Sequence, residues 1–507
     1  MMPIDVVIMA AGKGTRMKSK IPKVLHTLGA KPLLGHVIEA ALGLLARKIV
    51  LITGHESDWV RQGAASFFEQ HLNTDSKGGL DGASNGASNG VSKAKLEFAL
   101  QMPQLGTGHA VQQAAPLLDN GGLTLILSGD VPLTQVQTLK SLVQASVSCG
   151  SSNLTQTSKP GSPVCALSLL TLNTKNPFGY GRVIRDSKDS AKIIAIVEEK
   201  DATPEQKKIT EVYTGVLVAA TEDLRRWVNG LSNNNAQNEY YLTDVVKGAV
   251  ADGVPVSALS IDEPLEVMGV NSPAQLAELE RAYQLKQAHS LMQTGVRLKD
   301  PTRIDIRGAL DCGPDVEIDV NCVFKGTVKV GSQVRIGPNC VIEHAVIEDG
   351  AVLEAYTHIE GESSLKPVRV GALAKVGPFA RLRPGAVLGK DVHVGNFVEI
   401  KNSTLAAGAK ANHLAYVGDA VLEERVNFGA GAITANYDGA NKHQTVIEQD
   451  VHIGSNSVLV APVKIGASGT VGAGSTITKD TPPGALTITR AKQTSIANWT
   501  RPVKEKK

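Results

Sequence analysis

Apolar residues in the first half of the chain come in short runs, separated by stretches with helical spacing. Four runs are long enough for buried strands: 6–9, 49–52, 123–127 and 193–197. Strands that alternate with helices favour an α/β fold with a mostly parallel sheet. We therefore expect an α/β domain from residue 1 to about residue 270.

Two polar stretches interrupt this pattern. Residues 73–95 contain Gly-Ala-Ser-Asn-Gly-Ala-Ser-Asn-Gly, a repeat of small polar side chains with nothing to bury. Such a composition predicts a flexible surface insertion without chemistry. Residues 146–159 have a similar character, and we expect a second polar loop there.

A helix is predicted next, over residues 273–292, where Ala, Leu, Glu and Gln dominate. Ser272 is a candidate N-cap, and Pro273 stands at the first helical position, where proline is favoured. The predicted domains are therefore 1–271, a linking helix over 272–293, and a second domain over 294–507.

The second half has a period of six residues, which begins at about residue 315. An aliphatic residue is often followed by glycine, and a small or β-branched residue comes four places after the aliphatic one, as in Val330-Gly331…Val334 and Ile336-Gly337…Cys340. A hexapeptide period is typical of a parallel β-helix, in which each hexad forms one face of a coil. The register slips near 361–368 and between about 405 and 450, so we expect loops at both places.

Composition narrows the choice of partners and compartment. The net charge is only +3, so we expect neither a nucleic-acid partner nor a membrane partner. The five cysteines include no C-x-x-C pair, which argues against a disulfide framework and against a zinc site. Cys322 and Cys340 fall in the small-residue register of the hexads, so we predict buried thiols. With no signal peptide or apolar span in the sequence, we expect a cytoplasmic protein.

The most informative motif is Ala10-Ala-Gly-Lys-Gly-Thr-Arg-Met17, which follows the first predicted strand and precedes a helix-like stretch. A glycine-rich turn at that place exposes a cluster of backbone N–H groups that binds phosphate. The segment lacks the spacing of a P-loop, and Met17 stands where a dinucleotide fingerprint needs its third glycine. Together with Arg16 and Lys23, the motif resembles the signature of the nucleotide-sugar pyrophosphorylases.

An acidic residue follows the strand predicted over 123–127. Asp130, after Ser128-Gly129, would lie at the carboxyl end of a parallel strand, where ligands bind in α/β folds. A carboxylate beside a bound triphosphate suits Mg²⁺. Gly129-Asp130 also suits a simple turn before Val131-Pro132, but the nearby Arg16 loop favours the metal role.

Several motifs of the second half narrow the resemblance further. They are Phe379-Ala-Arg-Leu-Arg-Pro-Gly385, His393-Val-Gly-Asn-Phe-Val-Glu-Ile-Lys401, His413-Leu-Ala-Tyr-Val-Gly-Asp419, Asn427-Phe-Gly-Ala-Gly-Ala-Ile-Thr-Ala-Asn-Tyr-Asp-Gly439 and Arg501-Pro-Val-Lys504. Over nearly the whole chain, the sequence resembles the bacterial bifunctional N-acetylglucosamine-1-phosphate uridyltransferases/glucosamine-1-phosphate N-acetyltransferases. The resemblance implies a Rossmann-like α/β nucleotidyltransferase domain and a left-handed parallel β-helix. It also implies a homotrimer that makes UDP-N-acetylglucosamine for peptidoglycan and lipopolysaccharide.

For the first domain, the resemblance implies transfer of the uridylyl group from UTP, with Mg²⁺ held by Asp130 and Asn271. Arg16 would hold the leaving pyrophosphate, and Lys23 would lie by the α-phosphate. The family normally has asparagine where this chain has Tyr213, so a backbone or hydroxyl contact would have to replace an amide contact to the sugar. The implied UTP and UDP-sugar residues are Met9, Ala10, Ala11, Gly12, Lys23, Gln101, Gly106, Thr107, Ser128, Gly129, Asp130, Gly181, Glu198, Tyr213 and Asn271.

For the second domain, the resemblance implies acetyl transfer from acetyl-CoA to glucosamine 1-phosphate. His413 would be the general base, and Glu399 would orient its imidazole. The implied glucosamine-phosphate residues are Arg383, Lys401, Tyr416 and Asn427. The implied acetyl-CoA residues are Ala430, Asn436, Tyr437, Ser455, Ala473 and Arg490.

Two other functions remain open from the sequence. The chain could be a sugar-1-phosphate nucleotidyltransferase alone, with the β-helix as a trimerising or regulatory module. It could also be a binding and assembly protein without activity. The set of His413, Tyr416 and Asn436-Tyr437 argues against the first, because a scaffold does not need it. Arg16, Lys23 and Asp130 argue against the second.

Overall fold

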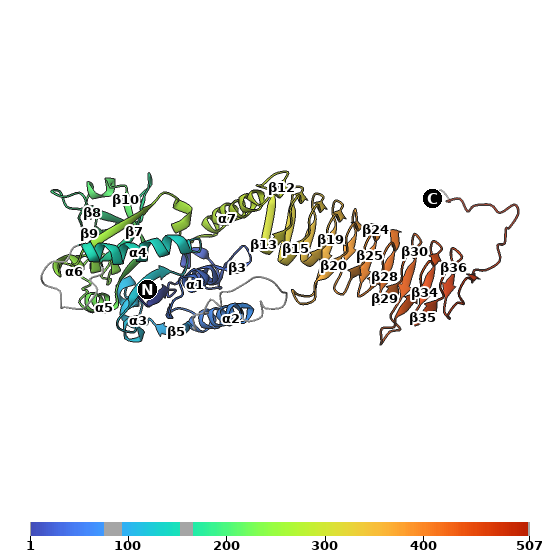
Figure 1. Cartoon of the computed structure of the whole chain (residues 1–507), viewed down its shortest axis with the longest axis horizontal. Coiled ribbons are helices and arrows are strands. Elements are labelled where there is room, and N and C mark those ends of the chain that lie inside the picture. Colours follow the sequence, from blue (N-terminus) through green and yellow to red (C-terminus); the bar gives the residue numbers. More distant parts are fainter. Residues whose placement is uncertain (1, 76–93, 153–165, 505–507) are drawn as a thin grey trace. The chain divides into compact units, whose positions relative to one another are not determined.

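The computed structural model describes residues 2–75, 94–152 and 166–504 (Figure 1). It forms two compact units, Met1–Tyr283 and Gln284–Lys507. Most of the predicted polar insertion over 73–95 and part of that over 146–159 lie outside the described residues. Within the described residues, no helix is long and apolar enough to cross a membrane.

The first unit is built on a mixed sheet with the strand order β11-β7-β10-β6-β1-β4-β5 within the described residues. Strands β6, β1, β4 and β5 are parallel, and β10 joins them antiparallel, so the predicted α/β fold is confirmed. β8 and β9 form an antiparallel extension beside β10. The strands are β1 (Ile4–Met9), β4 (Lys48–Thr53), β5 (Lys95–Leu100), β6 (Leu123–Ser128), β7 (Leu167–Asn173), β8 (Gly181–Arg185), β9 (Ile193–Val197), β10 (Glu211–Ala220) and β11 (Val256–Ile261).

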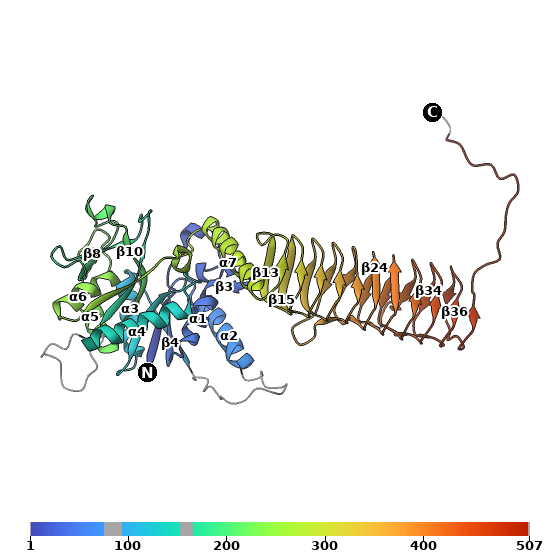
Figure 2. The ribbon, with the colours of Figure 1, turned by 45° about the horizontal axis from the view of Figure 1, so that its top comes forward.

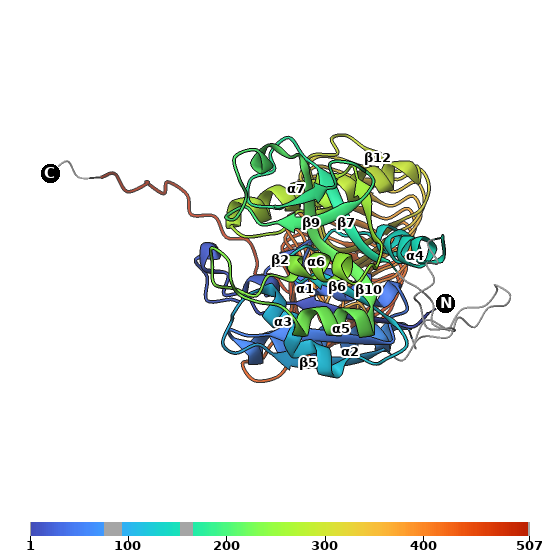
Figure 3. The same ribbon diagram turned by 90° about the vertical axis from the view of Figure 1, so that its left-hand side faces the viewer.

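Helices cover both faces of this sheet. The helices α1 (Leu33–Gly43), α2 (Ser57–Asp75) and α4 (Val136–Ser152) contribute apolar side chains to one core cluster, on one face. The helices α3 (Thr107–Ala114), α5 (Thr221–Asn229) and α6 (Val245–Ala251) contribute to the core of the other face and lie together in Figure 3. Their apolar stripes bury the near-continuous hydrophobic runs of the central strands.

The helix-like stretch predicted after Pro22-Lys23 is preceded by further short elements. The glycine loop leads first to the short 3₁₀ turns η1 (Thr15–Met17) and η2 (Lys23–Leu25). The small hairpin of β2 (Thr27–Leu28) and β3 (Lys31–Pro32) comes next, and α1 begins at Leu33. The exposed N–H groups of this loop therefore do not form the N-terminus of an α-helix.

The second polar stretch also differs in part. Helix α4 continues to Ser152, so residues 146–152 are helical. Ser146 is fully buried, and its hydroxyl donates a 2.5 Å hydrogen bond to the carbonyl of Ala166. The polar composition of residues 146–152 predicted a loop, but the buried hydrogen bond of Ser146 is compatible with a continued helix.

Helix α7 (Pro273–Gln293) leads from the first unit into the second. The Gln275 N–H donates to Ser272 Oγ at 3.2 Å, which confirms the predicted N-cap. Beyond α7, the chain forms a parallel β-helix.

The β-helix consists of two long parallel sheets within the described residues, and their strands are stacked in Figure 2. The first contains β12 (Arg297–Leu298), β14 (Glu317–Ile318), β16 (Arg335–Ile336), β18 (Val352–Leu353), β21 (Lys375–Val376), β24 (His393–Asn396), β27 (Lys410–His413), β30 (Asn427–Phe428), β33 (His452–Ile453), β36 (Thr470–Val471) and β38 (Leu486–Thr487). The second contains β13 (Ile304–Cys312), β15 (Cys322–Val330), β17 (Val341–Ile347), β19 (His358–Glu360), β20 (Val368–Val370), β22 (Arg381–Leu382), β23 (Val387–Leu388), β25 (Glu399–Lys401), β26 (Thr404–Leu405), β28 (Tyr416–Gly418), β29 (Ala420–Leu422), β31 (Ile433–Ala435), β32 (Thr445–Ile447), β34 (Val458–Val460), β35 (Val463–Ile465) and β37 (Thr476–Ile477).

The slips in the hexad register have two structural causes. The segments 361–367 and 436–444 are loops that leave the coil, each with a short antiparallel bridge. The loop expected between about 405 and 450 is therefore the one over 436–444, and between 405 and 430 the coil continues without a loop. There the coil is one residue shorter: Asn396 and His413 are stacked 17 residues apart, whereas Asn321 and Asn339 are 18 apart.

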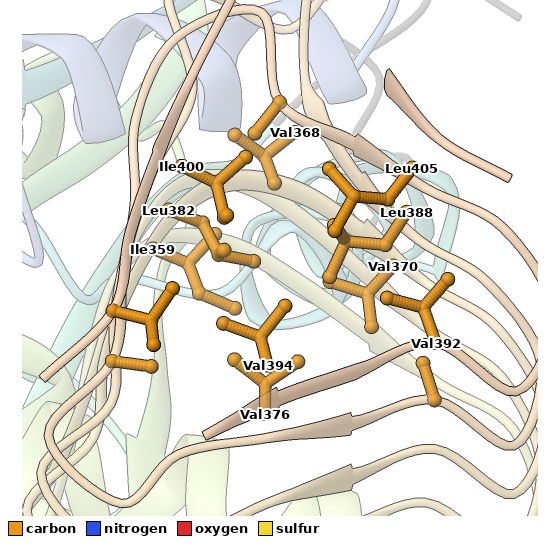
Figure 4. Close-up of a cluster of buried hydrophobic side chains, with 14 of the residues drawn as sticks. Ile359, Val368, Val370, Val376, Leu382, Leu388, Val392, Val394, Ile400 and Leu405 are labelled. Atoms are coloured by element: carbon orange, nitrogen blue, oxygen red, sulfur yellow. The ribbon is translucent and has the colours of Figure 1, made fainter. Parts of the chain in front are cut away.

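Aliphatic side chains fill the axis of the β-helix. Figure 4 shows Val370, Leu382 and Leu388 among the side chains that point inward, and all three are fully or almost fully buried. Cys322 and Cys340 belong to the same core as free, buried thiols, as predicted. The side chains of Cys149 and Cys165 lie outside the described residues.

Candidate functional site

A cavity of about 400 Å³ opens at the carboxyl ends of β1 and β6. The glycine loop forms one wall, and the segment between β5 and α3 forms another. Many of the predicted UTP residues meet there, together with four that sequence reasoning missed. The lining residues are Met9, Ala10, Ala11, Gly12, Lys23, Val24, Gln101, Gln104, Gly106, Thr107, Ala110, Ser128, Asp130 and Glu239.

Four charged or polar side chains converge at one end of this cavity. The Lys23 ammonium forms an ion pair with Asp130 Oδ2 and also donates to Asn271 Oδ1 at 3.1 Å. Arg16 donates to the same Asn271 oxygen at 2.9 Å. Residues up to 255 positions apart are therefore brought to one place.

Backbone contacts hold Asp130 and Asn271 side by side. The Val270 N–H donates to the Asp130 carbonyl at 3.0 Å, and the Asn271 N–H donates to Gln275 Oε1 at 2.9 Å, in the first turn of α7. The two candidate metal ligands therefore present oxygens toward a single cation, the Lys23 ammonium. A pair of hard oxygen donors that converge on one positive charge fits Mg²⁺ chemistry. Within the described residues, no three His, Cys, Asp or Glu side chains are clustered for a metal.

The part of the cavity wall that follows β5 is held by close backbone packing. Gly106 has φ of 108°, and a Cβ there would lie 2.6 Å from the Tyr240 carbonyl, so only glycine fits. Gln101 is almost fully buried, and its amide donates to the Gly106 carbonyl at 2.9 Å. Thr107 Oγ1 accepts from the Leu242 N–H at 3.0 Å. Gln104, which donates to the Ala11 carbonyl, joins this wall to the glycine loop.

The three predicted sugar residues lie together on the β8–β9–β10 extension. Tyr213 pairs with Gly181 across β10 and β8, so their side-chain positions share one face. A Cβ at Gly181 would lie 3.6 Å from Glu198 Oε2. Glu198 Oε1 accepts from Thr243 Oγ1 at 2.9 Å, and burial raises the pKa of this carboxyl.

The side chain of Tyr213 does not reach the surface of this site. It is 7% exposed and belongs to a hydrophobic core cluster, and its hydroxyl is buried without a hydrogen-bond partner. Burial raises its pKa above the usual range for tyrosine. The tyrosine hydroxyl, one of the two replacements for the amide that the sequence suggested, is therefore buried with the ring in the core.

Three of the predicted acetyl-CoA residues, Ala430, Ser455 and Ala473, form a column with His413 along one corner of the β-helix. The Gly431 N–H donates to the His413 carbonyl, Asn456 N–H to that of Ala430, and Gly474 N–H to that of Ser455. Arg490 donates to the Ala473 carbonyl at 3.0 Å. His413, Ala430, Ser455 and Ala473 therefore occupy successive rungs, although 60 positions of sequence separate the first from the last.

His413 has a different partner from the one predicted. Its Nδ1 contacts Asn396 Oδ1 at 2.7 Å, whereas Glu399 accepts a 2.8 Å hydrogen bond from Arg383. Asn396 is stacked directly beneath His413 in the β24–β27 pair. Within one chain, the register of the coils therefore places Asn396, and not Glu399, in contact with the His413 imidazole.

Three cations gather beside this column. Arg383 is paired with Glu399, and Lys401 lies one residue beyond the β25 core position Ile400. Lys442, on the loop over 436–444, and Arg383 lower the pKa of Lys401, with Lys442 the larger cause. Sequence reasoning missed Lys442, because its loop position says nothing about which strand it approaches. The cluster is suited to a phosphate group.

Asn436 and Tyr437 begin the same loop. The Asn436 side chain is buried and donates to Asp419, which also accepts from Asn402 at 2.5 Å. Tyr437 is exposed, and its hydroxyl donates to the Gly439 carbonyl at 2.7 Å. Tyr416 lies on β28 in register with Glu399, and Asn427 lies on β30, which leads to Ala430.

Comparison with known proteins gives matches for both units. The family model "MobA-like NTP transferase domain" matches residues 6–171, and "Bacterial transferase hexapeptide (six repeats)" matches residues 444–479. The "Bifunctional protein GlmU" of Polaromonas sp. (strain JS666 / ATCC BAA-500) is 58% identical over 100% of this chain and 99% of that protein. The protein of the same description from Albidiferax ferrireducens (strain ATCC BAA-621 / DSM 15236 / T118) is 57% identical over 99% of this chain and 100% of its own length.

Proposed function

Because the chain belongs to the family of the bifunctional GlmU proteins, we propose how each of its two units performs one of the family's two reactions. The chain is a bifunctional uridyltransferase and acetyltransferase that makes UDP-N-acetylglucosamine. The substrates are UTP, acetyl-CoA and glucosamine 1-phosphate. The alternative of a nucleotidyltransferase with an inactive β-helix is set aside, since the relatives match over the full length of the chain.

In the first unit, an oxygen of the sugar phosphate attacks the α-phosphorus of UTP, and pyrophosphate leaves on the opposite side. The protein's part is to position the groups and to neutralise charge. Lys23 lies at the cavity wall with its ammonium at the Asp130 end, which suits contact with the α-phosphate. Arg16, on the η1 turn, is suited to the leaving pyrophosphate because its planar guanidinium binds phosphate oxygens in pairs.

We propose that Asp130 and Asn271 hold a Mg²⁺ ion. Their oxygens already face one cation, the Lys23 ammonium, so the donor set and its convergence support this assignment. When bound, Mg²⁺ supplies charge neutralisation on the triphosphate. Lys23 and Arg16, which both donate to Asn271 in this structure, would be suited to contact phosphate oxygens.

The sugar is assigned to the face of β8 and β9 that carries Gly181 and Glu198. Gly181 packs closely against Ile196, where a Cβ would lie 2.7 Å from Cγ2, and the Glu198 carboxyl beside it is suited to a sugar hydroxyl. Tyr213 supports this face from the core side through its ring. The recognition of the acetamido group is therefore assigned to backbone atoms and not to the tyrosine hydroxyl.

In the second unit, the amine of glucosamine 1-phosphate attacks the thioester carbon of acetyl-CoA, and the C–S bond breaks. His413 takes the proton of the attacking amine and passes a proton to the leaving thiolate. Asn396 Oδ1 beside Nδ1 favours the tautomer with hydrogen on Nδ1, which leaves Nε2 as the base. Arg383, Lys401 and Lys442 are suited to the sugar phosphate.

We also propose that three copies assemble through the β-helix. The aromatic ladder, Tyr356, Phe379 and Phe397, supports this assembly: the three rings stack at centroid distances of 4.9 and 5.4 Å, and each is about half exposed. The next rung of the same corner is Leu414, adjacent to His413. An apolar stripe of this kind is typical of a protein interface. A neighbouring copy packed there would cover the acetyl-transfer corner.

The observation that carries the mechanism is the convergence of Arg16, Lys23, Asp130 and Asn271 at the nucleotide cavity. The test is a coupled assay with UTP, acetyl-CoA and glucosamine 1-phosphate, in which pyrophosphate and CoA thiol are measured separately. Asp130→Ala is expected to abolish pyrophosphate release and to leave thiol release near the wild-type rate. Equal loss of both products in a folded variant would refute two separate sites.

We propose a cytoplasmic location, because both co-substrates are cytoplasmic metabolites.

A further inference from the structure

The side-chain amide of Gln101 has a hydrogen-bonded nitrogen and, in the part of the chain that the structure describes, an oxygen without a protein partner. Its Nε2 donates to the Gly106 carbonyl at 2.9 Å and lies 3.3 Å from His109 Nδ1. A carbonyl only accepts, so Gly106 fixes the NH₂ group on that side. Within the described residues no hydrogen bond reaches Oε1, and Oε1 is not among the buried unpartnered atoms. It is therefore open to the cavity that Gln101 lines.

His109 completes this arrangement from the first turn of α3. With one amide hydrogen on Gly106, the other points to His109 Nδ1, which must then be an acceptor. A neutral imidazole carries one proton, so Nε2 holds it. In the structure Gln113 Nε2 lies 3.2 Å from His109 Nε2 and donates to the His109 carbonyl at 3.5 Å. The assigned tautomer requires the other orientation of this amide, with Gln113 Oε1 toward the Nε2 proton. Burial lowers the pKa of His109, so the ring is neutral at physiological pH.

An acceptor that faces a pyrimidine distinguishes uracil from cytosine. Uracil has hydrogen on N3, whereas cytosine has a lone pair there. An oxygen that faces N3 therefore gains a hydrogen bond with UTP and opposes the lone pair of CTP, whereas an oxygen that faced C4 would instead accept from the cytosine amino group.

We propose that His109 is a positioning residue that selects UTP over CTP by holding the Gln101 amide with Oε1 toward the base. The inference rests on the proposed uridylyl transfer. His109 is not among the residues that line the cavity, so it acts through Gln101. Its contribution is one hydrogen bond to a neutral group, so its loss changes base selection roughly two- to tenfold.

The test compares His109→Leu, which has no acceptor, with His109→Asn, whose Oδ1 restores an acceptor near the position of Nδ1. Pyrophosphate release is measured with UTP and with CTP as the varied substrate, at saturating N-acetylglucosamine 1-phosphate. His109→Leu is expected to raise KM for UTP two- to tenfold at unchanged kcat, and to lower the preference for UTP over CTP by a similar factor. His109→Asn is expected to behave like the wild type.

Two controls keep the outcomes distinct. Thermal midpoints and CoA thiol release from the same preparations verify that each variant is folded. Unchanged base preference in His109→Leu would overturn the inference, as would equal impairment of His109→Asn, which would point to ring packing. A wild-type protein that does not release pyrophosphate from UTP would instead overturn the proposed function, and the inference with it.

Discussion

At the scale of single residues, burial and pairing distinguish side chains that act on substrates from those that support the site. Tyr213 and Glu198 differ in how their polar groups are satisfied: the tyrosine hydroxyl is buried without a partner, and the Glu198 carboxyl is partly buried with one partner, Thr243. Both groups are stability liabilities that substitutions can relieve.

We predict that Tyr213→Phe keeps or raises the free energy of unfolding, whereas Tyr213→Asn lowers it. The first change removes a hydroxyl that has no partner, and the second replaces a packed ring by a small polar group and leaves a cavity, at a cost of about 2–5 kcal/mol. Urea unfolding followed by fluorescence measures both values. Two variants of equal stability would show that the ring is not a packing element.

Glu198→Gln tests the effect of burial on the carboxyl. Because burial raises the folded-state pKa above the unfolded value of 4.5, the folded protein keeps its proton where the unfolded chain has lost it. Stability is therefore lost as pH rises from the unfolded pKa through the folded pKa. Glutamine keeps the acceptor for Thr243, so the variant is expected to melt higher than the wild type near pH 8 and equally near pH 4.5. An equal rise of the melting temperature at both pH values would contradict a raised pKa of Glu198 as the cause.

The acetyl site allows a direct comparison of two neighbours of His413. Asn396→Ala removes the contact to His413 Nδ1 and is expected to reduce CoA thiol release about tenfold, the scale of one lost orienting hydrogen bond. His413→Ala is expected to reduce it by about 10²-fold or more. The double variant should lose no more than His413→Ala alone, since Asn396 acts through the histidine. Multiplicative losses would give Asn396 an independent role.

At the scale of elements, residues that are one coil apart in the sequence are stacked on one another in the β-helix. Each coil of 17 or 18 residues returns the chain to the same corner, one step further along the axis. The aromatic ladder and the column of His413, Ala430, Ser455 and Ala473 are stacked for this reason. Half-exposed aromatic rings in such a column remain costly until another surface covers them.

We predict that the double substitution Phe379→Ser, Phe397→Ser disrupts the trimer and leaves the β-helix folded. Neither ring fills the axis, so the core is kept, while the apolar surface offered to a neighbouring copy is removed. Light scattering measures the mass, and far-UV circular dichroism serves as the folding control. Pyrophosphate release should persist in the dissociated variant. A trimer of unchanged mass would show that the copies pack through another face.

At the scale of the whole molecule, the two units have separate hydrophobic cores. One core contains Ala288 of α7 and the β-helix side chains from Val296 to Ile477, and the clusters of the first unit contain none of them. Independent cores imply independent unfolding.

Uridylyl and acetyl transfer are therefore expected to be lost at different urea concentrations when both are measured in the same samples. The first unit depends on a mixed sheet and packed helices, and the second on repeated coils that stabilise their neighbours. Activity after dilution into the assay, at matched residual urea, gives the two midpoints. Coincident midpoints would show that the units unfold as one.

Local patterns were sufficient to predict most of the fold. The strand-length apolar runs, the hexad period and the Ser272 cap are properties of neighbouring residues, and each appears in the structure. The glycine loop and Asp130 could be placed at one sheet edge because parallel strands end there together. The helix expected after the loop is present as α1, but two tight turns and a small hairpin come before it.

The sequence by itself determined the two architectures, the family and most of the candidate residues, because these depend on periodicity and on contiguous motifs. Only the tertiary structure decided which distant side chains meet. It placed Asn396 rather than Glu399 against His413, buried the Tyr213 ring, and brought Lys442 to Lys401. Those outcomes depend on coil length and on packing across the sheet, which no stretch of neighbouring residues encodes.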